Sequence, residues 1–225
     1  MTTGARPQGL IPGPMPRSLY NRIAGQNIER LAALSDGLFA VAMTLLVLDL
    51  RAPAAEAVQS EHDLLTALGA LAPRLVPYLM SFLTLGIFWL GQQAQLDRLA
   101  RGDRDLAWIH IAFLCGVSLV PFSTALLAEF ITYRTALLVY WANILVLGLL
   151  LLWTWGHATR ARLIKDDTPP AVVAAICRRI IIAQSLYALG AALCIIDTWW
   201  SIVFIVLVQI NYAIAPPWPF ARPAA

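Results

Sequence analysis

The sequence predicts an all-α integral membrane protein, and three observations carry that prediction. Of the 225 residues, 60% are hydrophobic and only 13% are charged, whereas soluble domains carry roughly a quarter charged residues. Six apolar stretches are close to the ~20 residues that a helix needs to cross ~30 Å of hydrocarbon. The basic residues fall between these stretches and form no cluster on a soluble face, which argues against nucleic-acid binding.

The six stretches are expected to be six transmembrane helices. They run over Leu31–Leu50, Leu71–Gly91, Leu106–Leu127, Ala136–Trp155, Arg179–Ile196 and Trp199–Ala215. Only Asp197 and Thr198 separate the last two, which form either a tight helical hairpin or a re-entrant pair. The expected division is an N-terminal segment (1–29), a six-helix transmembrane domain (30–215) and a C-terminal tail (216–225). Residues 1–25 lack the apolar core of a signal peptide, so we expect none.

Orientation follows from the basic residues. Thirteen of the sixteen Lys and Arg residues lie on one side: Arg6, Arg17, Arg22, Arg30, Arg98, Arg101, Arg104, Arg160, Arg162, Lys165, Arg178, Arg179 and Arg222. Arg51, Arg74 and Arg134 lie on the other side. By the positive-inside rule, both termini are predicted to be cytoplasmic in a plasma (inner) membrane.

The sequence offers no sign of an enzyme, a metal site or a bound cofactor. Cys115, Cys177 and Cys194 lie in or beside apolar stretches with no C-x-x-C pair, so we interpret them as packing residues. His62, His110 and His157 are scattered. No Ser/His/Asp set, His-Glu-x-x-His motif or clustered carboxylate pair occurs.

The first stretch holds an ionisable residue inside the membrane. Ser35 and Asp36 lie about a turn and a half beyond Arg30. A central acid costs about 2.5–3.5 kcal/mol on insertion scales, so it must face protein or water. Either Asp36 pairs with an arginine or a ring N–H on a neighbouring helix and fixes packing, or its carboxylate contacts ions directly.

Helical geometry gives this stretch two faces. At about 100° per residue, Val41, Thr44 and Leu48 each fall within about 40° of the direction of Gly37. Ser35 points almost opposite to that stripe. A stripe of this kind is a helix-packing seam or a pore lining, and periodicity does not decide between them.

Two motifs resemble the transmembrane protein 175 family of lysosomal potassium channels and their bacterial homologues. The first is Arg30-xxx-Leu34-Ser35-Asp36-Gly37 followed by Ala42-x-Thr44-Leu45-Leu46, similar to the family's R-xxx-F-S-D. The second is Leu119-x-Pro121-Phe122-x-Thr124-x-Leu126-x-x-Glu129 in the third stretch. This chain departs from the family at Leu34, where phenylalanine is usual, and at Gln92 and Gln93, where bacterial members often have histidines. Proton sensing through those histidines is therefore not expected.

The resemblance implies a homotetramer with a central pore lined by the first helix, passing K⁺ passively. Val41 matches the position of the hydrophobic constriction, and Thr44 matches a threonine ring that contacts K⁺ transiently. Leu48 lies a further turn outward and would form a second dry collar. Arg30, Ser35 and Asp36 would form a structural bracket, meaning a set of polar contacts that holds the first helix to neighbouring helices or subunits. Short loops and one set of spans favour a prokaryotic member.

Two alternatives remain open from the residues themselves. The Thr44 hydroxyl can bond back to the Ala40 carbonyl of its own helix. An ion- or proton-coupled carrier using Asp36 and His110 would be the rival function, although carriers tend to show paired repeats and interrupted helices.

Overall fold

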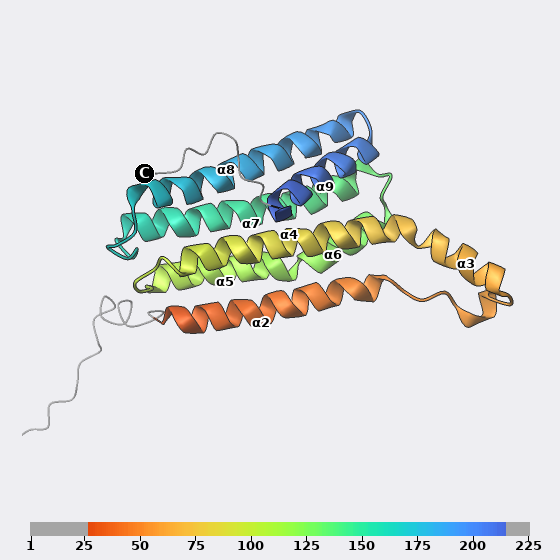
Figure 1. Ribbon diagram of the computed structural model, residues 1–225, viewed down its shortest axis with the longest axis horizontal. Helices are drawn as coiled ribbons and strands as arrows, with labels where there is room; N and C mark the ends of the chain where they lie inside the picture. Colours follow the sequence, from red (N-terminus) through yellow and green to blue (C-terminus); the bar gives the residue numbers. More distant parts are fainter. Residues whose placement is uncertain (1–26, 215–225) are drawn as a thin grey trace, which may run out of the picture.

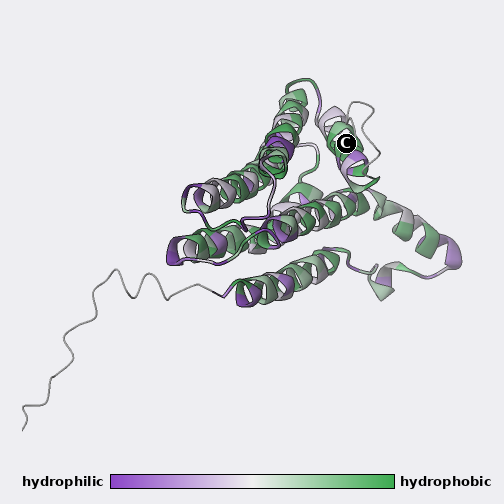
Figure 2. Cartoon of the chain, turned by 60° about the vertical axis from the view of Figure 1, so that its left-hand side comes forward, coloured by the Kyte–Doolittle hydropathy of each residue, from purple (hydrophilic) through white to green (hydrophobic). Residues whose placement is uncertain are grey.

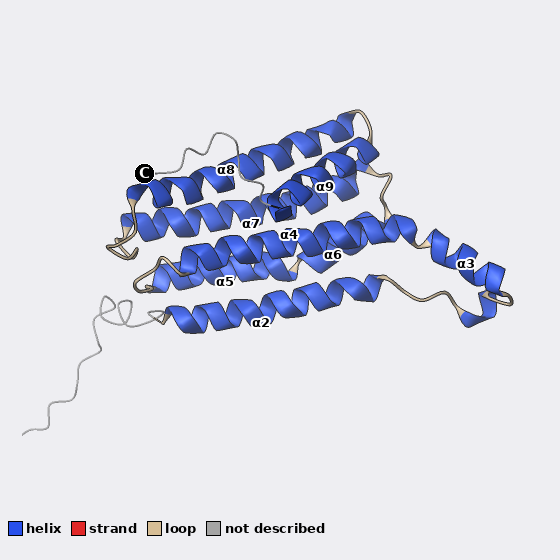
Figure 3. Cartoon of the chain, in the orientation of Figure 1, coloured by secondary structure: helices blue, strands red, loops and turns tan. Residues whose placement is uncertain are grey.

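The computed structural model describes residues 27–214, and in that range the chain consists of helices and loops (Figure 3). The long helices lie side by side along a common direction (Figure 1). The helices are α2 (Ile28–Leu46), α3 (Glu61–Ala70), α4 (Ala72–Leu96), α5 (Arg104–Ser118), α6 (Val120–Glu129), α7 (Arg134–Arg160), α8 (Pro170–Ala192) and α9 (Thr198–Ile214), with 3₁₀ turns η1 (Val47–Asp49), η2 (Ala55–Ala57) and η3 (Leu193–Ile195). The predicted terminal segments 1–29 and 216–225 fall almost wholly outside the described residues.

Five of the six predicted spans are long and apolar enough to cross a membrane. The sixth, α9, has 17 residues and is shorter than the other five. Several spans extend beyond the predicted bounds, since α4 continues to Leu96 and α8 begins at Pro170. A helix that leaves the hydrocarbon keeps its backbone bonds in water, so an apolar run marks the membrane segment and not the helix end.

The third predicted span is broken in two. α5 ends at Ser118 and α6 begins at Val120, with Leu119 between them. Pro121 has no N–H to donate to the Val117 carbonyl, and its ring crowds the preceding turn. Proline therefore divides this span into two segments that together cover Arg104–Glu129.

A short helix that the apolar pattern did not predict lies between the first two spans. α3 is capped by Ser60, whose side chain accepts a hydrogen bond from the Asp63 backbone N–H at 3.2 Å. The Gln59 N–H donates to the Asp63 carboxylate at 3.2 Å. Hydrogen bonding by Ser60 and then by Gln59 lowers the pKa of the Asp63 carboxyl. Ser60 followed three residues later by Asp63 is a capping pattern that could have predicted the start of α3. A search for apolar runs of 20 residues does not detect it.

The core of the bundle is built around α7. Leu137, Tyr140 and Leu147 on α7 are fully buried, and α7 packs against α5, α6 and α8. In contrast, α2 lies at the edge of the bundle (Figure 1), and only 22% of its most apolar window is buried. Hydrophilic residues gather toward the helix ends and loops, while the lengths of the helices are mostly hydrophobic (Figure 2).

A chain of buried polar side chains crosses this core. Thr124 Oγ1 on α6 lies 2.6 Å from Ser81 Oγ on α4, and Thr84 Oγ1 lies 3.1 Å from Tyr140 Oη. Gln209 Nε2 on α9 donates to Thr84 Oγ1 at 2.7 Å. Buried polar groups need partners, so this chain fixes α4, α6, α7 and α9 in one register.

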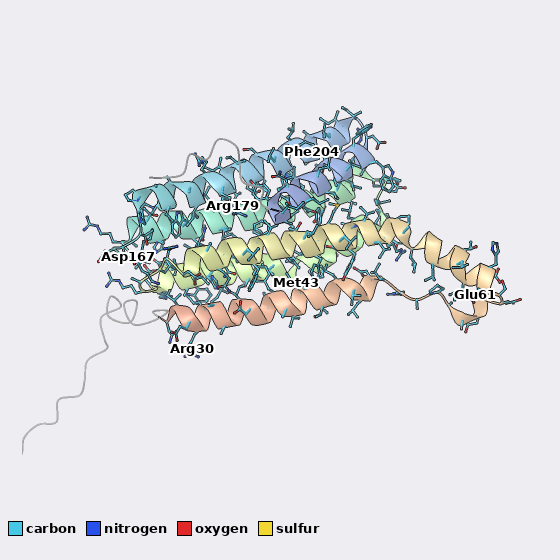
Figure 4. The ribbon with its side chains drawn as sticks, viewed as in Figure 1. Arg30, Met43, Glu61, Asp167, Arg179 and Phe204 are labelled. Atoms are coloured by element: carbon cyan, nitrogen blue, oxygen red, sulfur yellow. The ribbon has the colours of Figure 1, made fainter. Side chains whose placement is uncertain are left out.

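The two ends of the bundle carry the residues that the sequence placed on opposite sides. Figure 4 shows Arg30 and Asp167 at one end and Glu61 at the other. At the end of the bundle that carries Glu61, Arg74 pairs with Glu129 at 2.6 Å. That pair neutralises one of the acidic side chains on this side.

Candidate functional site

Ser35 anchors α2 to the inside of the bundle. Its side chain is fully buried, and its Oγ accepts a hydrogen bond from Gln92 Nε2 on α4 at 2.7 Å. The same oxygen lies 2.8 Å from His110 Nε2 on α5 and 3.0 Å from the Leu31 carbonyl. Three helices therefore meet at one hydroxyl. The Gln92 carbonyl oxygen is buried and has no partner among the described residues.

Asp36 makes a second contact between α2 and α4. Its Oδ1 accepts a hydrogen bond from Trp89 Nε1 at 2.8 Å and another from Gln93 Nε2 at 2.7 Å. Both donors lie on one face of α4, four residues apart. The partner of Asp36 in this structure is thus a ring N–H together with a carboxamide.

Arg30 lies apart from these contacts. It is exposed in the first turn of α2 (Figure 4), where its backbone N–H is capped by Asn27 Oδ1 at 3.0 Å. Within residues 27–214, the ion pairs are Arg74–Glu129 and His157–Asp103. The structure therefore brings Ser35 and Asp36 into one bracket between helices, and the share of Arg30 in that bracket stays a prediction.

The predicted stripe lies on the opposite, uncovered face of α2. Val41 is 55% exposed and Leu48 is 66% exposed, while Thr44 is also exposed. A side chain built at Gly37 would meet no atom within 4 Å. Leu45 is 42% exposed as well, so exposure within one chain does not separate the stripe from its flank.

The Thr44 hydroxyl bonds back to its own helix, but to a different carbonyl from the one expected. Thr44 Oγ1 donates to the Val41 carbonyl at 2.8 Å, whereas the sequence suggested Ala40. A threonine in a helix reaches either the i−3 or the i−4 carbonyl, depending on its rotamer. The hydroxyl oxygen retains its acceptor capacity in both cases.

Leu48 also departs from simple helical geometry. It lies in η1, the 3₁₀ turn that follows the end of α2. A 3₁₀ turn advances about 120° per residue, about 20° more than an α-helix. The alignment of Leu48 with Val41 and Thr44, calculated for an unbroken α-helix, is therefore shifted by a few tens of degrees.

Four partners of the bracket were not predicted as such: Trp89, Gln92, Gln93 and His110. A usable signal existed, because an aromatic N–H and two carboxamides occur within five residues of an otherwise apolar span. In a membrane such polar groups require partners. No group of three His, Cys, Asp or Glu side chains that could hold a metal ion occurs within residues 27–214.

These features define a helical membrane protein of several spans. Its first span is tied to its own bundle by polar contacts on one face and left bare on the other. A family described as "Endosomal/lysosomal potassium channel TMEM175" matches residues 30–121, which include the bracket, the stripe and their partners.

Relatives extend that match over most of the chain. A potassium channel of Chamaesiphon minutus is 32% identical over 189 residues, covering 82% of this chain and 93% of the relative. A potassium channel of Streptomyces collinus is 36% identical over 149 residues, or 63% of this chain and 71% of the relative. The human endosomal/lysosomal proton channel TMEM175 is 30% identical over 109 residues, 45% of this chain but 22% of that longer protein.

The fold matches as well. The crystal structure of a lysosomal potassium-selective channel TMEM175 homologue from Chamaesiphon minutus superposes with a TM-score of 0.73 at 30% identity, covering 84% of this chain and 97% of that one. The chain belongs to the TMEM175 family. That family consists of ion channels, so the protein is not an enzyme.

Proposed function

We propose that the protein is a potassium-selective channel that conducts passively, and that four copies surround a central pore lined by α2. Two kinds of observation support this proposal. The relatives that cover most of the chain are named potassium channels. The first helix presents an apolar face that its own bundle leaves uncovered.

The observation that carries the proposal is that the Ser35 and Thr44 side chains lie on opposite faces of α2. Nine residues at about 100° each make two and a half turns, so the two side chains point in opposite directions. Because Ser35 is buried against α4 and α5, the rotation of α2 is fixed and Thr44 faces away from the bundle. In a closed rotational assembly, identical copies of this face meet at the symmetry axis.

Each ring in such a pore would have a distinct role. Four Thr44 hydroxyl oxygens replace part of the hydration shell of a permeant K⁺, which binds transiently. Rings of Val41 and Leu48 form dry collars on either side that gate by dewetting. In this proposal no resident cofactor is needed, and K⁺ is the only bound ion.

The proposed topology has six spans and both termini in the cytoplasm. α9 would be the sixth span, since at about 1.5 Å per residue its 17 residues cover about 25 Å. Segments 1–29 and 216–225 would flank the channel domain (30–215) on the cytoplasmic side. The excess of basic residues at that end supports this orientation in the plasma membrane of a prokaryote.

A coupled carrier is the weaker alternative. A carrier carboxylate must bind and release its ion or proton in each cycle, whereas Asp36 Oδ1 already accepts from Trp89 and Gln93. The named functions of the relatives also favour a channel.

Single-channel recording of the purified protein in a planar bilayer tests the proposal. We expect discrete current steps, a reversal potential set by the K⁺ gradient, and a mass of four subunits in detergent. Smooth macroscopic transport without steps would indicate a carrier, and a stable monomer would exclude a pore built from four α2 helices.

A further inference from the structure

A cleft of about 530 Å³ lies between α4, α7 and α8, beside the C-terminal end of α9. Its volume is within the roughly 300–1,000 Å³ of small-molecule sites. α9 ends at Ile214 and contributes Tyr212 and Ala213 to the lining of the cleft.

The walls of the cleft are mostly aliphatic and aromatic, and Gln184 adds one carboxamide. Leu90 and Ala94 come from α4, and Ile176 and Ala183 come from α8. Leu90 is 58% exposed, so the cleft opens to the outer surface of the subunit. In a membrane protein, an aliphatic cleft open to the outside is surrounded by lipid chains.

One cation lies among these apolar walls. Arg179 is the only charged residue among the described residues that line the cleft. Its guanidinium carbon lies 5.4 Å above the ring centroid of Tyr212 on α9, and this cation–π contact holds the charge beside the end of α9 (Figure 4). The two ion pairs found within residues 27–214 do not include Arg179.

Arg179 lies just inside the headgroup level of one leaflet. α8 and η3 rise about 24 Å from Arg179 to Ile195 at about 1.5 Å per residue. Trp199 and Trp200, both exposed just beyond η3, are typical of the opposite membrane interface. With a hydrocarbon core of about 30 Å, Arg179 lies a few ångströms inside the other interface, within reach of lipid phosphates by extending its side chain.

We infer that this cleft binds an anionic phospholipid, with its phosphate on Arg179 and one acyl chain between α4 and α8. The part of α8 that lines the cleft from Arg179 to Tyr187 is about 12 Å long at 1.5 Å per residue, close to the roughly 15 Å of one leaflet. Arginine binds phosphate oxygens through paired N–H donors. Basic pockets between membrane helices are sites of this kind. The proposed topology makes this the cytoplasmic leaflet.

The test is lipid binding by the full-length, delipidated protein in non-ionic detergent. Phosphatidylglycerol and phosphatidylcholine with identical acyl chains are added in turn, and native mass spectrometry counts the lipids bound per subunit. Both lipids carry a phosphate, but the choline ammonium of phosphatidylcholine offsets the charge that Arg179 would meet. We therefore expect phosphatidylglycerol to bind about tenfold tighter. Arg179→Gln should abolish the preference. The matched control is Arg178→Gln, which removes an adjacent exposed arginine outside the cleft and should retain it.

A second variant tests the acyl chain independently of charge. Ala183→Phe fills the cleft and should weaken binding of both lipids. Equal losses in Arg178→Gln and Arg179→Gln would indicate general surface electrostatics, and unchanged binding in Ala183→Phe would place the chain elsewhere; either result overturns the proposal. A several-fold gain in lipid affinity on deletion of residues 215–225 would also overturn the proposal, because the C-terminal tail would then be what occupies the cleft. Binding restricted to dissociated subunits would assign the cleft to a second copy.

Discussion

Replacing Asp36 by alanine removes one of the two α2 side chains that accept hydrogen bonds from α4. Trp89 Nε1 and Gln93 Nε2, at 2.8 and 2.7 Å from Oδ1, both lose their partner. Interhelical hydrogen bonds in membranes average about 0.6 kcal/mol and reach about 1.7 kcal/mol. Two such bonds give a loss of roughly 1–3 kcal/mol. For a chain of this size, each kcal/mol lowers the Tm by roughly 2–4 °C.

The assay is the fraction of assembled protein that survives heating in detergent, followed by gel filtration. Asp36→Asn keeps an acceptor oxygen without the charge, so its loss should be smaller than that of Asp36→Ala. Asp49→Ala, which removes a carboxylate from the far end of the same span, should behave like the unmodified protein. A stable Asp36→Ala assembly whose only change is ion preference would refute the bracket, since the carboxylate would then line the conduction path.

Three further predictions concern the pore, the topology and the packing. Val41→Asn should wet the proposed collar and raise single-channel conductance severalfold, because a polar ring removes the dewetting barrier; an unchanged conductance would place Val41 off the axis. In a cysteine-free background, a cysteine at Glu61 should react with an impermeant thiol reagent on intact cells and one at Arg162 should not, and the reverse pattern would invert the topology. Gly190→Ala should lower stability by about 1–3 kcal/mol, because its Cβ would lie 2.8 Å from an α9 side chain. The matched Gly86→Ala, with no atom within 4 Å, should be neutral or slightly stabilising; equal losses in both would contradict this account of the α8–α9 contact.

The spans were predictable because lipid enforces a simple rule on the sequence. Every backbone polar group in hydrocarbon must be paired within the protein, so a crossing helix needs a long apolar run. That rule located all five of the long spans. It said nothing of α3, which lies outside any such run and whose start is set by Ser60 and Asp63. The rule also predicted α5 and α6 as one helix. Hydropathy averaged over about 20 residues does not register a single proline, whereas Pro121 interrupts the backbone hydrogen bonds at that point.

The candidate site was predictable in its angles but not in its partners. Helical periodicity alone set Ser35 opposite to the stripe, and the structure places Ser35 inside and Val41 and Thr44 outside. Which donors meet Ser35 and Asp36 depends on how α4 and α5 pack against α2, and sequence spacing within one helix does not contain that information. The carbonyl that accepts from Thr44 depends on one rotamer choice, which is equally invisible to periodicity.

The packing of one subunit leaves the stripe and its flank equally bare. Leu45 and Val47, on either side of the stripe, are exposed as Val41 and Leu48 are. A face of this breadth is covered in the membrane by lipid, by other subunits or by both. Selectivity is therefore a sharper probe of the axis than exposure, because only a side chain that touches the ion changes it.

The reversal potential of Thr44→Ala, measured under opposing K⁺ and Na⁺ gradients, tests the central claim most directly. The variant removes four hydroxyl oxygens from the proposed ion path and leaves the pore wide, so K⁺ preference should fall more than current. Each tenfold loss in the K⁺/Na⁺ permeability ratio moves the reversal potential by about 59 mV, because both ions carry one charge. Leu45→Ala, on the flank of the same helix, should leave it unchanged. An unchanged reversal potential in Thr44→Ala together with a shift in Leu45→Ala would show that a different face of α2 lines the pore.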